Sequence, residues 1–220
     1  MAGGKRYKFA GSTLEVQTGY VAASPPQAIT GITSAEPPVV TATGSDYDDG
    51  TVVRISGVVG MVEVNDNVYV TDDGTANTFE LAGVDATAYT DYVSGGIVEE
   101  AAFSNFCELT GANQQDAAAD QIEVTTICST AKEFEQGLSD SGTLQLDYNF
   151  APNEAVQAAI RAAKVSGEAI AFRITLPKQG GIIILIGTVQ QSSFTASVNG
   201  VWTASTTVKL TGEMFVLPGV

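Results

Sequence analysis

Polar and apolar side chains alternate without a break along residues 143–150. This period of two predicts a β-strand with one face in a hydrophobic core. The apolar positions are Leu144, Leu146, Tyr148 and Phe150. The polar positions are Thr143, Gln145, Asp147 and Asn149. The polar face must lie against water, whether bulk solvent or an enclosed aqueous space.

A short helix and a second strand are predicted directly after this strand. Asn153 is a good N-cap residue, and an apolar stripe at helical spacing follows it. Gly167, a residue type common at helix C-termini, ends the pattern. Alternation then resumes over residues 169–176. The sequence therefore predicts a unit of strand, helix and strand.

The last forty residues predict further strands. The continuous apolar run from Ile182 to Ile186 indicates a strand that is buried on both faces, or one whose outward face meets another subunit. Asn199-Gly200 fits a type I′ turn and predicts a hairpin. Trp202, beside that turn, suits a core or subunit contact better than a ligand platform. The candidate subunit contacts are Ile182, Ile184, Ile186 and Trp202.

An inserted module is predicted between two parts of the main domain. Asp49-Gly50 and Asp73-Gly74 are turn signals among β-branched runs, and Gly95-Gly96 reads as a flexible exit. Residues 27–97 hold eleven acids and one base, whereas the rest of the chain holds fourteen acids and nine bases. We therefore assign residues 27–97 to a small all-β insert, and 1–26 with 98–220 to a discontinuous β-sandwich domain.

The composition excludes several classes of function. The formal net charge of −15 disfavours binding of nucleic acid through phosphate contacts. The chain contains no histidine, the commonest general base and metal ligand at neutral pH. The acidic stretch around Asp48 lacks the closing glutamate of a calcium loop, since that position is Gly57. We expect no catalytic residue, cofactor or metal, and we expect the two cysteines to be buried free thiols.

Three short motifs in the second half resemble those of the tail tube proteins of long-tailed, non-contractile bacteriophages. They are VTT at 124–126, AKEF at 131–134 and GLSDSG at 137–142. The segment from 49 to 96 also resembles a small β-barrel-like repeat of many phage structural proteins. The resemblance implies a mainly β tail-tube sandwich with one short helix, whose inner sheet joins a ring-wide β-barrel. The inserted all-β domain would lie on the outer surface.

The resemblance also implies a function and a set of partners. Copies of the chain would form stacked, hexameric rings, and the resulting tube would conduct double-stranded DNA during ejection. Further implied partners are the tape-measure protein in the lumen and the tail tip and terminator proteins. The sequence shows no signal peptide and no apolar run long enough to cross a bilayer, so we expect no membrane partner. We expect synthesis in the host cytoplasm and a place in the virion.

Two regions receive specific roles from these expectations. Residues 110–120 are polar and rich in alanine, and we expect a mobile loop. It would either mediate ring stacking, as an extended loop near this place does in tail tube families, or be a disordered surface loop. The stacking candidates are Asn113, Gln114, Gln115 and Asp116. The polar face of residues 143–149 would line either the lumen or the outer surface.

An alternative function stays open at this point. The chain could be a β-sandwich adhesin or decoration protein that binds a cell-surface ligand through its acidic insert. Such a protein would bind a receptor without polymerising, so assembly separates the two hypotheses. The sequence lacks the cluster of exposed aromatic residues expected of a carbohydrate-binding platform.

Overall fold

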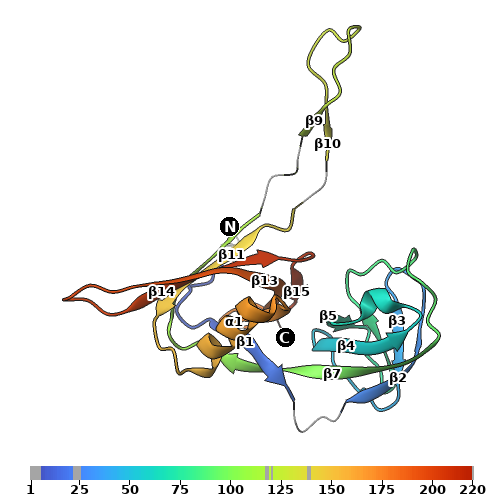
Figure 1. Ribbon diagram of the computed structural model, residues 1–220, viewed down its shortest axis with the longest axis horizontal. Coiled ribbons are helices and arrows are strands. Elements are labelled where there is room, and N and C mark those ends of the chain that lie inside the picture. Colours follow the sequence, from blue (N-terminus) through green and yellow to red (C-terminus); the bar gives the residue numbers. More distant parts are fainter. Residues whose placement is uncertain (1–5, 22–25, 117–118, 120, 138–139, 220) are drawn as a thin grey trace, which may run out of the picture.

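The computed structural model describes residues 6–21, 26–116, 119, 121–137 and 140–219. It is mainly β, with one α-helix and one 3-10 helix among these residues (Figure 1). The barrel half contains β2 (Gln27–Ile32), β3 (Val39–Ala42), β4 (Val52–Val59), η1 (Val62–Val64), β5 (Asn67–Asp72), β6 (Thr78–Leu81) and the first half of β7 (Ser94–Asn105). The other half contains β1 (Thr13–Tyr20), β8 (Leu109–Gln115), β9 (Gln121–Glu123), β10 (Phe134–Gln136), β11 (Thr143–Asn149), α1 (Ala155–Ser166), β12 (Ala169–Thr175), β13 (Ile182–Thr195), β14 (Thr203–Leu210) and β15 (Phe215–Leu217).

Six strands close into a barrel. Neighbours follow the order β2, β3, β6, β5, β4 and β7, and an additional pairing of β7 with β2 completes the circle. β-Branched and aromatic residues fill its interior; the largest fully buried side chains are Phe79, Ile55, Met61, Leu81 and Val40. A closed barrel leaves no free edge within this ring of strands.

Strand β7 belongs to both halves of the molecule. Its residues 94–100 pair with β4, and its residues 101–105 pair with β1. The Gly95-Gly96 pair lies inside this strand opposite β4, so the expectation of a flexible exit was wrong. Gly96 has φ +96°, and a Cβ there would approach the Val58 Cγ2 atom to 2.5 Å. Glycine therefore allows close strand contact at this point instead of supplying a hinge.

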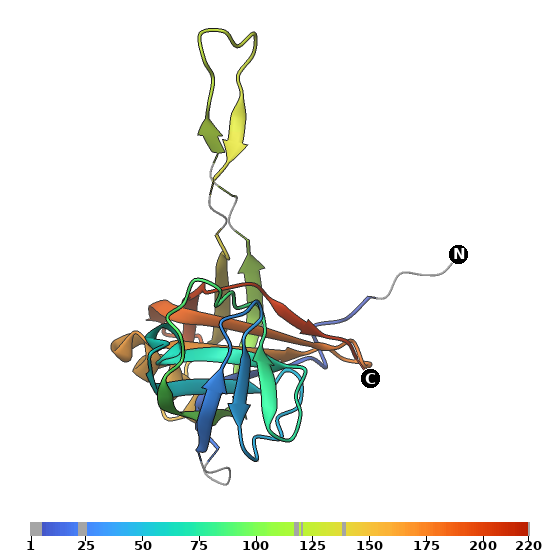
Figure 2. The same ribbon diagram turned by 90° about the vertical axis from the view of Figure 1, so that its right-hand side faces the viewer.

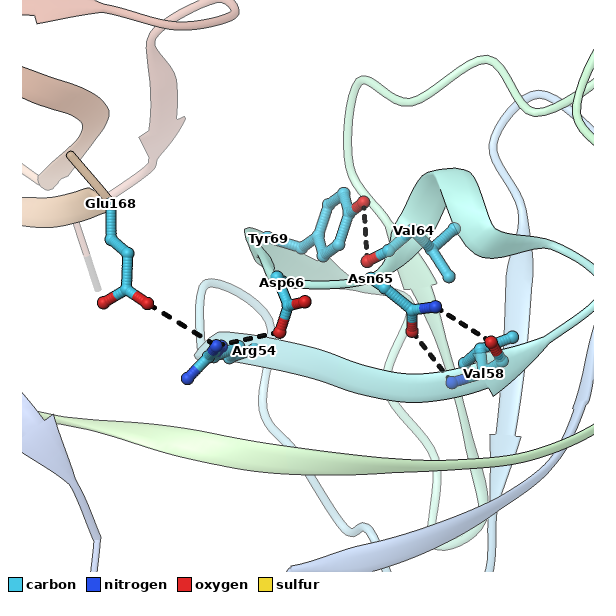
Figure 3. Close-up of polar contacts among 7 residues, drawn as sticks. All are labelled: Arg54, Val58, Val64, Asn65, Asp66, Tyr69 and Glu168. Atoms are coloured by element: carbon cyan, nitrogen blue, oxygen red, sulfur yellow. Dashed lines mark hydrogen bonds and ion pairs between the residues drawn. The ribbon is translucent and has the colours of Figure 1, made fainter. Parts of the chain in front are cut away.

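Polar contacts of Arg54 join the barrel to the other half (Figure 3). The Arg54 Nη2 atom lies 2.8 Å from the Asp66 carboxylate and 3.7 Å from that of Glu168, which precedes β12. The guanidinium also lies over the ring of Tyr20, at the end of β1, with 5.8 Å between the guanidinium carbon and the ring centroid. Nearby, the side-chain amide of Asn65 donates to and accepts from the backbone of Val58 at 2.8 Å. The contacts of Arg54 with Glu168 and Tyr20 connect the two halves, whereas those of Asp66 and Asn65 lie within the barrel.

The other half is a sandwich whose two layers belong to one continuous sheet. The order continues from β7 through β1, β12, β13, β14 and β11 to β8, and β15 pairs with β13. The 14-residue strand β13 passes from one layer into the other at a register shift between Val189 and Gln191. A core between the layers includes Val16, Leu144, Leu146, Phe172 and Leu185, and α1 packs Ile160 into it.

A second apolar cluster covers the outer face of the layer formed by β1, β12 and the first half of β13. Ala171 and Ile184 alternate with the core residues Phe172 and Leu185 and point the other way, toward Val52 and Val70 of the barrel. Ile184 and Leu185, at the centre of the apolar run, are therefore buried on opposite faces of this layer within a single chain. This arrangement is the first of the two alternatives that the apolar run at 182–186 predicted.

Two local predictions were wrong in detail. The helix N-cap is Glu154, not Asn153, and it makes no side-chain capping bond; Gly167 ends the helix in the left-handed conformation. The β13–β14 hairpin exists, but its strands end at Thr195 and Thr203. Its turn is closed by the Gly200 amide donating to the Ser197 carbonyl at 3.1 Å. Neither Asn199 nor Gly200 has a positive φ, so the turn is not type I′.

No helix among the described residues is long and apolar enough to cross a membrane.

Candidate assembly surfaces

One face of the sandwich is a broad polar surface, which we name the polar platform. It is built by β8, β11, β14 and the second half of β13, whose registers place directly opposed residues on the same face. Its members are Asn113, Gln115, Thr143, Gln145, Asp147, Asn149, Gln191, Ser193, Thr195, Thr203, Ser205, Thr207 and Lys209. The four predicted lumen-facing residues thus share this face with three neighbouring strands.

The reverse face of the same strands packs into the core of the sandwich. Leu144, Leu146 and Tyr148 of β11 are buried in the core. The buried side chain of Gln157 connects α1 to the end of β11: its amide donates to the Asn149 carbonyl and its oxygen accepts from the Ala151 amide, both at 2.9 Å. Alternation along each strand therefore separates a fixed apolar face from a polar face open to water.

Charge on the platform is sparse. Asp147 is its only acid and Lys209 its only base. The Lys209 ammonium forms an ion pair with Asp140, a partly exposed carboxylate at the platform edge. The hydrogen bond from Lys209, and then one from the Gly142 amide, lower the pKa of Asp140. The Asp147 carboxylate accepts a long bond of 3.4 Å from the Gln145 amide, and the Asp147 carbonyl accepts a bond of 2.9 Å from the Thr110 hydroxyl. The surface is therefore hydrophilic and weakly negative.

The platform sheet has an open edge on each side. β8 pairs with β11 and with no other described strand. On the far side, β12 pairs with β13 only as far as Thr188, so residues 190–195 pair with β14 alone among the described strands. Exposed strand edges can pair with another chain. One sheet thus presents two different edges that a second copy of the chain could complete.

A two-stranded arm projects from the end of β8 and β11 (Figures 1 and 2). β9 and β10 pair with each other in a separate sheet. The expectation of a loop at 110–120 was wrong for Asn113, Gln114 and Gln115, because these residues belong to β8 and pair with Gln145, Leu144 and Thr143. Asp116 follows β8, and 117, 118 and 120 lie outside the described residues. The projecting element is the arm beyond them.

The arm ends in a defined turn. The Ser129 amide donates to the Thr126 carbonyl at 3.0 Å, and the Thr126 amide donates to the Ser129 hydroxyl at 3.1 Å. Ile127 and Cys128 therefore occupy the two central positions of the turn and are exposed. The cysteines were expected to be buried; both are free, but both are exposed.

An apolar pocket of about 360 Å³ opens where β8 begins. Its lining includes Phe9, Leu14, Phe106, Cys107, Leu109 and Ala112. The pocket lies between the two layers of the sandwich, at the end of β8 opposite to the arm. Sequence reasoning missed this pocket, because it joins the segment before β1 to the β7–β8 connection.

The predicted subunit contacts fall into two groups. Ile184 is 1% exposed, and Ile182 and Ile186 pack beside it against the barrel. The burial of Ile184 within its own chain excludes its side chain from an intersubunit contact in this conformation. Trp202 is 53% exposed and forms a cluster with Phe194 and Phe150, with ring centroids 5.1 to 6.1 Å apart. Trp202 is exposed, whereas Ile182 and Ile186 keep part of their surface open.

The model of the phage tail tube protein family matches residues 59–217, well over half of the chain. The chain belongs to the phage tail tube protein family. Among solved structures, a chain from the tail of an empty GTA particle with C6 symmetry is similar at 18% identity and a TM-score of 0.43, covering 52% of this chain and 86% of that one. No curated protein matches the chain.

Membership of the tail tube family identifies the protein as a structural component of a phage tail. The family match extends from the end of β4 in the barrel to β15, and it includes the platform, the arm and the pocket wall on β7 and β8. Among the described residues, no group of three or more acidic or cysteine side chains could hold a metal ion.

Proposed function

We propose that copies of this tail tube protein close into rings, six per ring as the family resemblance implies, and that the rings stack into a tube. The observation that carries the proposal is a polar sheet with two different open edges. A contact between unlike edges is heterologous, and it closes into a ring when the rotation between copies permits. β8 of one copy would pair with residues 190–195 of the next.

The polar platform would line the lumen. Two layers of the sandwich have two outer faces, and the barrel covers one of them through the cluster around Ile184. The platform forms the other outer face, so a lumen-facing platform leaves the barrel outside. Its polar groups and the single acid Asp147 would give a wall that neither binds DNA nor holds the tape-measure protein tightly.

We also propose the two domains that the sequence predicted. Residues 27–97 would form the outer module, and 1–26 with 98–220 the tube domain, with β7 continuous across the boundary. Eleven of the 25 acids lie in 27–97, which would make the outside of the tube acidic and soluble. The exposed cluster of Trp202, Phe194 and Phe150 would contact the neighbouring copy in the ring.

The arm would contact the next ring. It leaves the body at the end of the platform strands and extends beyond the folded core (Figure 2). Tail tip and terminator proteins would bind the two ends of the stack. We also propose that the protein is made in the host cytoplasm before it enters the virion.

Electron microscopy of the concentrated protein tests the assembly directly. We expect hollow tubes of uniform width with regular outer projections. Replacing residues 121–136 by a short glycine linker should leave a folded protein that forms no long tubes. Monomers that never assemble, even with a tail tip complex present, would contradict the proposal and favour the adhesin or decoration protein, for which no described feature gives support.

Charge reversal on the platform tests the lumen. Gln145→Lys with Asp147→Lys should leave folding intact but slow DNA passage, because lysines at these exposed positions would bind phosphates. The matched control is Asp46→Lys with Asp48→Lys, at exposed positions on the barrel. Normal DNA delivery by phage that carry the platform variant would contradict the lumen assignment.

A further inference from the structure

The arm tip presents an apolar side chain to solvent. Ile127 is fully exposed, at 105%. It lies in a turn held by the two Thr126–Ser129 bonds, by a Ser129 hydroxyl bond to Glu133 at 3.1 Å, and by a bond from the Val124 amide to the Glu133 carbonyl at 2.9 Å. Turns favour glycine, asparagine and similar residues over β-branched ones. Such a local conflict is expected where a residue serves a function.

The pocket at the start of β8 is apolar and therefore complements the apolar side chain of Ile127. Phe9, which is 53% exposed, forms part of its lining together with Leu14, Leu109 and Ala112. Its volume of about 360 Å³ leaves ample room for an isoleucine side chain. An exposed apolar pocket of this kind would gain from burying an apolar group of a partner.

The positions of the arm and the pocket suit a repeating contact. The pocket includes Leu109, the first residue of β8, whereas the arm begins after Gln115, the last residue of β8. Leu109 and Gln115 therefore lie about 20 Å apart along this strand, at 3.3 Å per residue. The arm also points away from the body in both views (Figures 1 and 2). A tip at one end and a pocket at the other form a head-to-tail contact that each added copy repeats.

The charges beside the two surfaces are also complementary. Arg6 and Lys8 precede the lining residue Phe9 in the sequence, and they outnumber Glu108, which stands between the lining residues Cys107 and Leu109. The arm carries Glu123, Glu133 and Glu135 against the single base Lys132, which pairs with Glu123 at 3.3 Å. Opposite charges at the rim of an interface fix its register and raise the rate of association.

We propose that the arm tip of one copy docks in the β8 pocket of a copy in the adjacent ring, with Ile127 inserted beside Phe9 and Leu109. This inference rests on the proposed stacking of rings and names the surface that receives the arm. Docking can be tested without any substitution in the interface. Cys128 neighbours Ile127, and Cys107 lines the pocket, so docking brings the only two cysteines of the sequence together across the contact.

Cross-linking of the native cysteines tests the contact. The concentrated full-length protein is treated with a short bis-maleimide, and cross-linked peptides are identified by mass spectrometry. We expect a ladder of oligomers joined through Cys107 and Cys128. Cys107→Ser or Cys128→Ser alone should abolish the ladder, whereas a mixture of the two variants should give one cross-linked dimer.

The outcomes separate this inference from the proposed function. Tubes that form without any link between Cys107 and Cys128 would overturn the docking site and leave the tube function intact. The link without tubes would support the docking site and contradict the tube function. Links that join only Cys128 to Cys128 would place two arm tips together and would also overturn the docking site.

Two sets of variants sharpen the test. Ile127→Asp should raise the concentration needed for assembly by about tenfold or more, from the lost burial of one isoleucine. The control Val165→Asp removes an apolar side chain that is 89% exposed on α1 and should have no effect. Arg6→Glu with Lys8→Glu should weaken assembly, and Glu135→Lys should restore part of it in the same chain. Wild-type assembly by Ile127→Asp would contradict the docking site.

Discussion

The barrel and the platform sheet of this tail tube protein manage their strand edges in opposite ways. In the barrel, the pairing of β2 with β7 closes the circle of six strands. In the platform sheet, β8 and residues 190–195 of β13 keep one side unpaired among the described strands. Both regions use the same alternation of polar and apolar residues, so the difference lies in topology. A closed module can be carried on the surface of a polymer without pairing with others, whereas an open sheet is incomplete until it finds a partner.

The largest contrast concerns the two halves of β13. Ile184→Ala, in the half between barrel and tube core, should lower the free energy of unfolding by about 2–5 kcal/mol, because it leaves a cavity at a buried site. Ser193→Ala, on the platform half, should change it by less than about 0.5 kcal/mol. Denaturant unfolding of the unassembled protein measures both values. If Ile184→Ala has normal stability but fails to assemble, the result would favour the predicted role of Ile184 as a subunit contact.

Loss of the buried side-chain amide of Gln157 should give the next largest change in the free energy of unfolding. Gln157→Leu removes the two hydrogen bonds that connect α1 to the end of β11 and leaves the Asn149 carbonyl and the Ala151 amide without them. We expect a loss of about 1–3 kcal/mol in unfolding free energy. Gln191→Leu, at an exposed platform position, is the matched control. Equal effects of the two substitutions would show that the platform does not depend on this connection.

The elements that could be predicted from the sequence are those whose pattern of apolar residues reflects a core formed within the same chain. The alternation at 143–150 and the helix after it follow from the core beneath them. The strand β8 could not be predicted in this way, because Asn113, Gln114 and Gln115 lack the β-branched pattern of a strand. They are extended because the backbone of β11 pairs with them.

The assembly surfaces were predictable only in part. The polar face of β11 follows from its period of two, but its extension across β8, β14 and β13 depends on registers that no local pattern encodes. The apolar run around Ile184 fits the barrel and a neighbouring subunit equally well, since both bury the same side chains. The exposed Ile127 within a polar turn was the one signal in the sequence that could have indicated the arm tip.

Alkaline pH should affect the barrel before the platform sheet. Burial raises the pKa of Tyr69 to about 12, and burial also raises that of Tyr47 to about 12. Their neutral forms are favoured in the folded state, so this stabilisation is complete below the unfolded value of 10.0 and is lost as the pH rises toward 12. Tyrosinate absorbance should therefore rise together with barrel unfolding. Tyr69→Phe should reduce this dependence on pH; an unchanged profile would assign the alkaline transition to other groups.

Acid pH should have the smallest effect, and at the platform edge. The hydrogen bonds from Lys209 and from the Gly142 amide lower the pKa of Asp140 below its ordinary value of 3.8. The carboxylate form is favoured in the folded state, so the stabilisation is present above pH 3.8 and is lost as the pH falls through the lower folded pKa. Unfolding of the wild type and of Asp140→Asn, followed from neutral to strongly acidic pH, should differ at neutral pH and converge in acid. Because the pair is exposed, added salt should shrink the difference at neutral pH. A difference that persists unchanged in acid would show that Asp140 acts through its shape at the Gly142 turn and not through its charge.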